Sequence, residues 1–232
     1  MAPAPRRIVL ASGSPRRVGL LRELGLRFSV VAPDVDEASL GPFADPPAAV
    51  EALAYAKASR VAAGCRDGLV LGFDTAVVIG DVVLGKPTDT ADAVRMIQCL
   101  AGQEHEVLTG LCVLDVSSAR LPGCDGLTPP GLAADGEEYG RAWMAGPGVA
   151  VGYERSFVRF GPLSPEEARA YVALGESLDK AGAYGIQGKA AIIVQMVRGC
   201  YYNVVGLPLY RLAQVLRWFD ADLLTGAGLE RT

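Results

Sequence analysis

The sequence predicts an α/β fold, and two observations lead to that prediction. Runs of consecutive apolar residues, typical of buried strands, alternate along the chain with segments whose apolar residues recur at helical spacing. Half of the 232 residues are hydrophobic and 21% are charged. This length and composition suit one large domain or two closely packed lobes with a substantial core.

Local signals place the individual elements. The first strand passes into a helix at Ser14, a favourable N-cap residue, and Pro15, which fits the first helical position. Residues 164–167 form a capping box for a later helix. In chain order, strands are expected over 7–12, 28–33, 68–74, 105–116, 149–160 and 190–199, with a hairpin turning at Gly80-Asp81, and helices over 15–24, 47–63, 90–101, 165–174 and 206–219.

Two segments are expected to lie outside this regular structure. Residues 117–148 are rich in Gly, Pro and short polar residues, which favours a long loop or a partly disordered insertion. The insertion falls between the strands 105–116 and 149–160, which are expected to pair. The last dozen residues, 221–232, are expected to form a frayed, flexible tail.

The composition excludes several classes of function. A net charge of −4 disfavours a general nucleic-acid surface or an acidic membrane surface as partner. Five widely spaced cysteines without a C-x-x-C pair disfavour a zinc site or a disulfide framework. The N-terminus lacks the apolar run of a signal peptide and no segment reaches transmembrane length, so a cytoplasmic location is expected.

The single histidine narrows the possible chemistry further. Multi-histidine metal sites are impossible, and His105 itself is interpreted as structural. Catalysis is therefore expected to depend on carboxylates, Lys and Arg, with or without a metal ion.

The turn after the first strand has the features of an anion site. A strand that passes through small residues into a helix presents free backbone N–H groups at the positive end of the helix dipole. Ser12 and Ser14 add hydroxyl groups, Gly13 allows close approach, and Arg16 and Arg17 add planar donors. The alternative is two solvated arginines in an ordinary first helical turn.

At this turn the chain resembles the Maf family of nucleoside triphosphate pyrophosphatases. The resemblance rests on several collinear motifs that cover nearly the whole chain outside 117–148. They are "ASGSPRR" (11–17), "DE" (36–37), "AYAKA" (54–58), "FDTAVV" (73–78), "GKP" (85–87), "HEVLTG" (105–110), "DKAGAYGIQG" (179–188) and "NVVGLPL" (203–209).

The resemblance implies hydrolysis of a nucleoside triphosphate between its α- and β-phosphates, with Mg²⁺ or Mn²⁺ as cofactor. It implies one domain over 1–232, an elongated, two-lobed, mixed-sheet architecture around a central cleft, similar to that of inosine triphosphate pyrophosphatases. It also implies a homodimer. Beside the enzyme, two functions stay open: a nucleotide-binding regulator of cell division or septum formation, and a phosphatase that releases orthophosphate.

The same motifs imply roles for individual residues. Asp74, expected at the end of its strand, is the implied catalytic carboxylate and shares a metal ion with Glu37, Asp36 being the less favoured ligand. Basic and hydroxyl groups would bind the phosphates, because a triphosphate carries a charge of about −4. These groups are Ser12, Ser14, Arg17, Lys57 and Lys86.

Base choice is implied by three further positions. Arg16, Thr75 and Gln187 match the dTTP/UTP branch of the family better than its 7-methyl-GTP branch, with CTP and modified uridine nucleotides left open. A glutamine amide offers both a donor and an acceptor to a uracil or thymine edge. Phe73 departs from the small residue usual before "DT", and either narrows the pocket or packs in the core.

Each of these residues also has an ordinary interpretation. Lys57 would be a solvated lysine on a long helix, and Asp74 would satisfy backbone groups at a strand end. Lys86 would be a turn residue, and the acidic run 34–37 would be a solvated loop. The collinear motifs, rather than any single residue, favour the functional interpretation.

Overall fold

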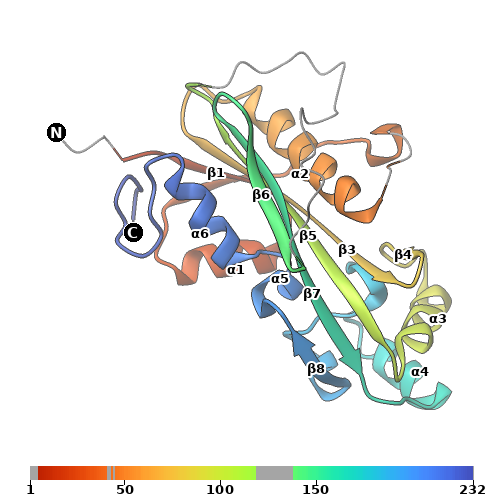
Figure 1. Cartoon of the computed structure of the whole chain (residues 1–232). Coiled ribbons are helices and arrows are strands. Elements are labelled where there is room, and N and C mark those ends of the chain that lie inside the picture. The colour runs from red at the N-terminus through yellow and green to blue at the C-terminus, as the bar shows by residue number, and fades with distance from the viewer. Residues whose placement is uncertain (1–4, 41–42, 44, 119–137, 232) are drawn as a thin grey trace.

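A mixed eight-stranded sheet organises the chain, as a computed structural model of residues 5–40, 43, 45–118 and 138–231 shows (Figure 1). Its strands follow the order β2-β1-β3-β5-β7-β6, with β4 paired to β3 and β8 paired to β7. Their bounds are β1 (Ile8–Ala11), β2 (Phe28–Val31), β3 (Leu69–Ile79), β4 (Val82–Leu84), β5 (Glu104–Asp115), β6 (Gly140–Gly146), β7 (Val149–Phe160) and β8 (Val194–Arg198). The predicted α/β class is confirmed.

Helices cover the sheet and its ends. They are α1 (Pro15–Glu23), α2 (Pro46–Ala62), α3 (Thr90–Leu100), α4 (Pro165–Ala173), α5 (Tyr201–Val205) and α6 (Leu209–Arg217), with 3-10 turns η1 (Glu37–Leu40), η2 (Ala181–Ala183) and η3 (Lys189–Ile192). The four N-terminal helices agree closely with the predicted ranges. No helix among the described residues is long and apolar enough to cross a membrane.

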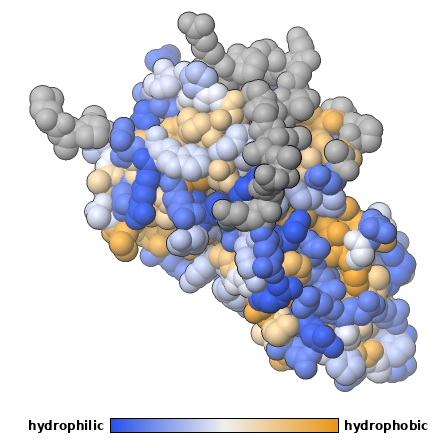
Figure 2. Space-filling model, viewed as in Figure 1, coloured by the Kyte–Doolittle hydropathy of each residue, from blue (hydrophilic) through white to orange (hydrophobic). Residues whose placement is uncertain are grey.

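The long strands give the molecule its elongated shape. β1 pairs in parallel with β2 and β3, whereas β3, β5, β7 and β6 are successively antiparallel. β3, β5 and β7 run from the end of the molecule that holds α1, α2 and α6 to the end that holds α3 and α4 (Figure 1). The space-filling view shows the same elongation, and the molecule is narrower at its lower right end, where Figure 1 places α3 and α4 (Figure 2). Elements at both ends are therefore placed by the same three strands.

Two glycines let α2 pack unusually close to the sheet. A Cβ at Gly72 would lie 2.2 Å from the carbonyl oxygen of Ala54, and one at Gly110 would lie 2.0 Å from that of Val50. Such distances are far inside van der Waals contact, so a side chain at either position would push α2 away. This contact fixes the height of α2, and of Lys57 on it, above β3.

His105 is part of the core, in agreement with its structural interpretation. It is 2% exposed, its Nε2 lies 2.8 Å from the Tyr184 hydroxyl, and its ring meets Phe160 and Tyr184 edge to face. Burial lowers the pKa of His105 to about 4. The ring is therefore neutral at physiological pH and packs as an aromatic residue.

Three expectations about strands and helices were wrong. β3 does not end at Asp74 but continues to Ile79, because the apolar run resumes after two polar residues. The segment 190–199, expected to be a buried strand, begins as η3, and β8 lies only partly buried beside β7. The helix expected over 206–219 starts at Leu209, because Gly206 has φ 105° and ends the separate helix α5.

Two expectations about irregular segments also need correction. Part of the expected insertion is regular, since residues 140–146 form β6 and turn at Gly148 into β7; residues 119–137 lie outside the described residues. Residues 221–231 are not a frayed tail. The backbone N–H of Arg6 donates to Gly228 O and that of Arg27 donates to Glu230 O, each at 3.0 Å, and Leu229 is buried.

Candidate active site

All ten residues selected from the motifs line one cleft of about 740 Å³. Its walls come from the turn between β1 and α1, from α2, β3 and the 85–86 turn, and from segments 179–187 and 204–206. The ten residues are Ser12, Ser14, Arg16, Arg17, Glu37, Lys57, Asp74, Thr75, Lys86 and Gln187. Residues up to 175 positions apart in the chain therefore meet around one space.

Lys57 lies between the two carboxylates that were predicted to hold a metal. Its Nζ is 2.5 Å from Asp74 Oδ1 and 2.7 Å from Glu37 Oε1. The side chains of Lys57 and Asp74 are each 14% exposed, whereas Glu37 is 55% exposed. Helix α2, strand β3 and turn η1 thus each contribute one charged group to the same corner of the cleft.

Asp74 is available for a second interaction there. Its Oδ1 is held by Lys57, while Oδ2 has no hydrogen-bond partner among the described residues. Because Asp74 is in the middle of β3, paired with Gly110 of β5, its backbone is fixed on both sides of the side chain. The carboxylate is therefore rigidly placed but still has one free oxygen toward the cleft.

Arg17 is built into the walls of the cleft rather than extended across it. Its Nε donates to Gly206 O at 2.7 Å, Nη1 donates to Ser12 Oγ and Phe73 O at 3.1 Å, and Nη2 donates to Thr75 Oγ1 at 3.0 Å. These four bonds join α1, the β1–α1 turn, β3 and the turn after α5. The Phe73 ring is fully buried 5.7 Å from the guanidinium, so this departure from the family pattern packs in the core.

Burial also affects the ionisation of Arg17. It lowers the pKa of Arg17 to about 10, an effect that the Asp74 carboxylate opposes and the neighbouring Arg16 reinforces. Arg17 therefore still carries its charge at neutral pH, and that charge lies behind the cleft surface.

Arg16 faces the opposite wall of the cleft. Its Nη1 is 3.6 Å from Asp179 Oδ2, and Asp179 is also bound to Lys180 Nζ at 2.5 Å. Asp179 and Gln187 belong to the same segment that lines the cleft. The two adjacent arginines thus separate: Arg17 points inward and Arg16 points across the cleft toward Gln187's wall.

The hydroxyl groups of the first turn remain available to a ligand. Ser14 occupies the N-cap position of α1 as predicted, but its side chain makes no capping hydrogen bond. Ser12 Oγ accepts from the Ser14 N–H at 3.2 Å and from Arg17, and it donates to no acceptor among the described residues. Lys86 is exposed at the rim and forms no ion pair within the described part of the chain.

Sequence reasoning missed two polar residues behind Thr75. Thr109 and Asn203 are both fully buried, and Thr109 Oγ1 lies 3.0 Å from Thr75 Oγ1 and 3.0 Å from Asn203 O. Asn203 Nδ2 in turn donates to Val107 O and Ser156 Oγ. Both residues stand inside quoted motifs, and the available signal was a threonine within the otherwise apolar strand 107–114.

The acidic groups of the cleft fit a cation that is bound together with a substrate. Among the described residues, no group of three or more His, Cys, Asp or Glu side chains converges on one point. Glu37 and Asp74 offer hard oxygen donors on either side of Lys57. Mg²⁺ in proteins is commonly held by one or two carboxylates with substrate phosphates and water, so two carboxylates suffice for such a site.

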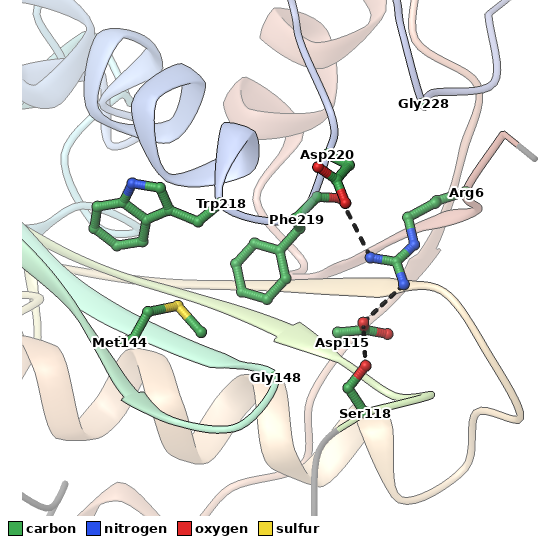
Figure 3. A pocket seen from close by; sticks show the side chains of 9 residues that line it. All are labelled: Arg6, Asp115, Ser118, Met144, Gly148, Trp218, Phe219, Asp220 and Gly228. Atoms are coloured by element: carbon green, nitrogen blue, oxygen red, sulfur yellow. Dashed lines mark hydrogen bonds and ion pairs between the residues drawn. The ribbon is translucent and has the colours of Figure 1, made fainter. Parts of the chain in front are cut away.

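A second cavity, of about 340 Å³, contains none of the predicted residues. It lies between the end of α6, the C-terminal segment and the ends of β5 and β6 (Figure 3). Its guanidinium group is already bonded, since Arg6 donates to Asp115 at 2.7 Å and to Phe219 O at 3.4 Å. The residues predicted from the motifs therefore lie in the larger cleft and not in this cavity.

The family model of "Maf-like protein" matches residues 7–219. The chain belongs to the Maf-like family. This Maf-like protein is 42% identical over 222 residues to a "dTTP/UTP pyrophosphatase" of Symbiobacterium thermophilum, covering 95% of the chain and 98% of the relative. It is 45% identical to a protein of the same name from Moorella thermoacetica, covering 94% and 97%. A third such relative, from Ruminiclostridium cellulolyticum, is 40% identical, covering 94% and 99%.

Proposed function

We propose that the protein hydrolyses dTTP and UTP between the α- and β-phosphates, releasing a nucleoside monophosphate and pyrophosphate. The observation that carries the proposal is the position of Lys57 between Asp74 and Glu37 in a cleft lined by further basic groups. The names of the three relatives, each similar over nearly its whole length, support the same substrates.

The cleft offers groups of the right charge for a triphosphate. Such a ligand carries a charge of about −4 at neutral pH. Arg16, Lys57 and Lys86 supply cationic side chains, and the α1 N-terminus adds backbone N–H groups. The hydroxyls of Ser12 and Ser14 can donate to phosphate oxygens, since neither donates within the described residues. Phosphoryl transfer depends mainly on such positioning and charge stabilisation.

Asp74 is the group that acts on the attacking water. Lys57 holds Oδ1, and the free Oδ2 accepts a hydrogen bond from the water and orients or deprotonates it for attack on the phosphorus. Lys57 Nζ, 2.5 Å from Oδ1, fixes the orientation of the carboxylate toward this water.

Glu37 and Asp74 would hold Mg²⁺ or Mn²⁺ together with the phosphates, and Lys57 between them limits the repulsion of the two carboxylates. When bound, the cation neutralises charge on the phosphate oxygens. Arg17 receives a revised role in this proposal. With four hydrogen bonds to protein acceptors, it positions Ser12 and Thr75 rather than extending to the phosphates.

The base would contact Arg16, Thr75 and Gln187. Thr75 lies next to Asp74 on β3, and Gln187 comes from the facing segment, so the two can contact different edges of one pyrimidine. The proposal also includes a homodimer in solution and a cytoplasmic location, and it includes neither a nucleic acid nor a membrane as partner.

The test is product identification. The purified protein is incubated with UTP, dTTP, CTP, ATP and GTP and either Mg²⁺ or Mn²⁺, and products are separated by ion-exchange chromatography. Pyrophosphate with UMP or dTMP supports the proposal, whereas orthophosphate identifies a phosphatase. Tight binding of nucleotides without turnover identifies a binding protein such as a regulator of cell division.

A matched pair of variants tests the role of Asp74. Asp74→Asn is expected to abolish turnover, a loss of at least about 10³-fold, while nucleotide binding measured by calorimetry persists. Asp67→Asn removes the same charge from an exposed position, 64% exposed, and is expected to retain wild-type activity. Wild-type activity in Asp74→Asn would remove this residue from the proposed mechanism.

A further inference from the structure

The buried polar network behind Thr75 determines which way each hydrogen bond runs. Thr109 Oγ1 lies 3.0 Å from Asn203 O. A carbonyl oxygen can only accept, so the one hydroxyl proton of Thr109 is used in this bond. The contact between Thr109 and Thr75, also 3.0 Å long, must then receive its proton from Thr75.

The other side of Thr75 is fixed in the same way. Arg17 Nη2 lies 3.0 Å from Thr75 Oγ1, and a guanidinium can only donate. Thr75 therefore accepts from Arg17 and donates to Thr109, and its only proton is directed away from the cleft. One lone pair of Thr75 Oγ1 is not used in these two bonds, and it is available to a ligand because Thr75 lines the cleft.

From this arrangement we infer that Thr109 is a positioning residue for base selection: it makes Thr75 a hydrogen-bond acceptor toward the substrate. The inference rests on the proposed function. An acceptor suits the imide N–H of uracil and thymine, whereas the corresponding ring nitrogen of cytosine is itself an acceptor and would oppose the Thr75 lone pair. Thr109 is fully buried and does not contact the substrate, so it acts only through the Thr75 proton.

The packing around Thr109 allows a clean substitution. Valine has nearly the same shape as threonine, and Thr109→Val would free the Thr75 proton to rotate toward the cleft. The carbonyl that loses its partner stays satisfied, because Asn203 O also accepts from the Gly206 N–H at 2.8 Å. The bond from Arg17 to Thr75 does not involve Thr109 and is retained.

The experiment compares kcat/KM for UTP and CTP, two pyrimidines that differ at this edge. The wild type is expected to prefer UTP. In Thr109→Val the UTP-to-CTP ratio is expected to fall about tenfold, mainly through faster CTP hydrolysis, since a freely rotating hydroxyl can donate to cytosine. Thr109→Ser restores the hydroxyl and is expected to keep the wild-type ratio. A purely structural role would instead lower both rates and leave their ratio unchanged.

Three results would overturn the inference. One is a wild type without preference for UTP, and another is an unchanged UTP-to-CTP ratio in a folded Thr109→Val protein. The third is a fall of this ratio in Thr109→Ser to the value expected for Thr109→Val. If the valine variant fails to fold, Thr109→Ala removes the same hydroxyl without adding an atom. If the wild type hydrolyses no nucleotide, the proposed function fails, and the ratio of UTP to CTP affinities, measured by calorimetry, still tests the inference in the same variants.

Discussion

Glu51 gives the structure a pH dependence that can be measured directly. It is fully buried on α2, and its Oε1 lies 3.5 Å from Nε of Arg141 on β6. Burial raises the pKa of Glu51 from 4.5 to about 7, although Arg141 opposes the shift. Neither carboxylate oxygen has a hydrogen-bond partner among the described residues, which explains why one ion pair does not compensate the burial.

The sign and the size of the effect follow from this shift. Between pH 4.5 and 7 the folded protein holds a proton on Glu51 that the unfolded chain has lost, so the free energy of unfolding falls as the pH rises. A rise from 4.5 to about 7 corresponds to about 3 kcal/mol. This lowering of the free energy of unfolding is nearly absent below pH 4.5 and complete above pH 7.

Glu51→Gln removes this contribution. The difference in the free energy of unfolding between the variant and the wild type is expected to rise by about 2–3 kcal/mol, in favour of the variant, from pH 5 to pH 8. Loss of the Arg141 partner changes the absolute stability of the variant, so the test compares the change between the two pH values and not the stability at either one. Urea denaturation of both proteins at the two pH values measures the gain.

The control for this experiment is Glu23→Gln, which removes the same charge from an exposed position on α1. It corrects for the change in net charge. If the stabilities of the wild type and Glu51→Gln change in parallel with pH, Glu51 is ionised in the folded state and the argument from burial is refuted.

Two further predictions concern the walls of the cleft. Gly72→Ala would place a Cβ 2.2 Å from a carbonyl oxygen of α2 and is expected to lower the free energy of unfolding by about 1–3 kcal/mol in urea denaturation. Gly19→Ala, on α1 with nothing within 4 Å, is expected instead to stabilise by about 0.5–1 kcal/mol; equal effects of the two changes would contradict the packing argument. Arg17→Lys retains the charge but cannot make the four hydrogen bonds of the guanidinium. Its free energy of unfolding is expected to be lower than that of the wild type by about 2–3 kcal/mol. An unchanged melting temperature for Arg17→Lys would show that these bonds do not hold the cleft together.

Much of the fold and the site could be predicted because their signals are local. Apolar periodicity and capping residues located α1 to α4 and most strands to within a few residues. The ten residues selected from the motifs all line the same cleft, although other residues of those motifs, such as Phe73 and His105, are in the core. The strand β6 was missed because glycines and prolines surround it, and its pairing with β7 depends on a partner and not on its own pattern.

What the sequence could not give is the set of contacts between distant positions. Glu51 looks like any polar residue in a helix, and only the approach of Arg141 from β6 shows it to be buried beside a cation. The anchoring of residues 221–231 depends on backbone bonds to Arg6 and Arg27, which no side-chain pattern reports. For the same reason the motif predicted a role for Arg17 but not whether its N–H groups donate to a phosphate or to acceptors within the protein.

The two arginines at the start of α1 show how this difference affects the site. Both add positive charge at the end of a helix where the dipole is already positive, which is unfavourable without acceptors. Arg17 finds its acceptors inside the protein, in Gly206 O, Phe73 O and two hydroxyls. Arg16 has an exposed partner, Asp179, at 3.6 Å. Of the pair, only Arg16 can therefore exchange its partner for an anionic ligand at little cost, whereas recruiting Arg17 would disrupt the wall that positions Thr75.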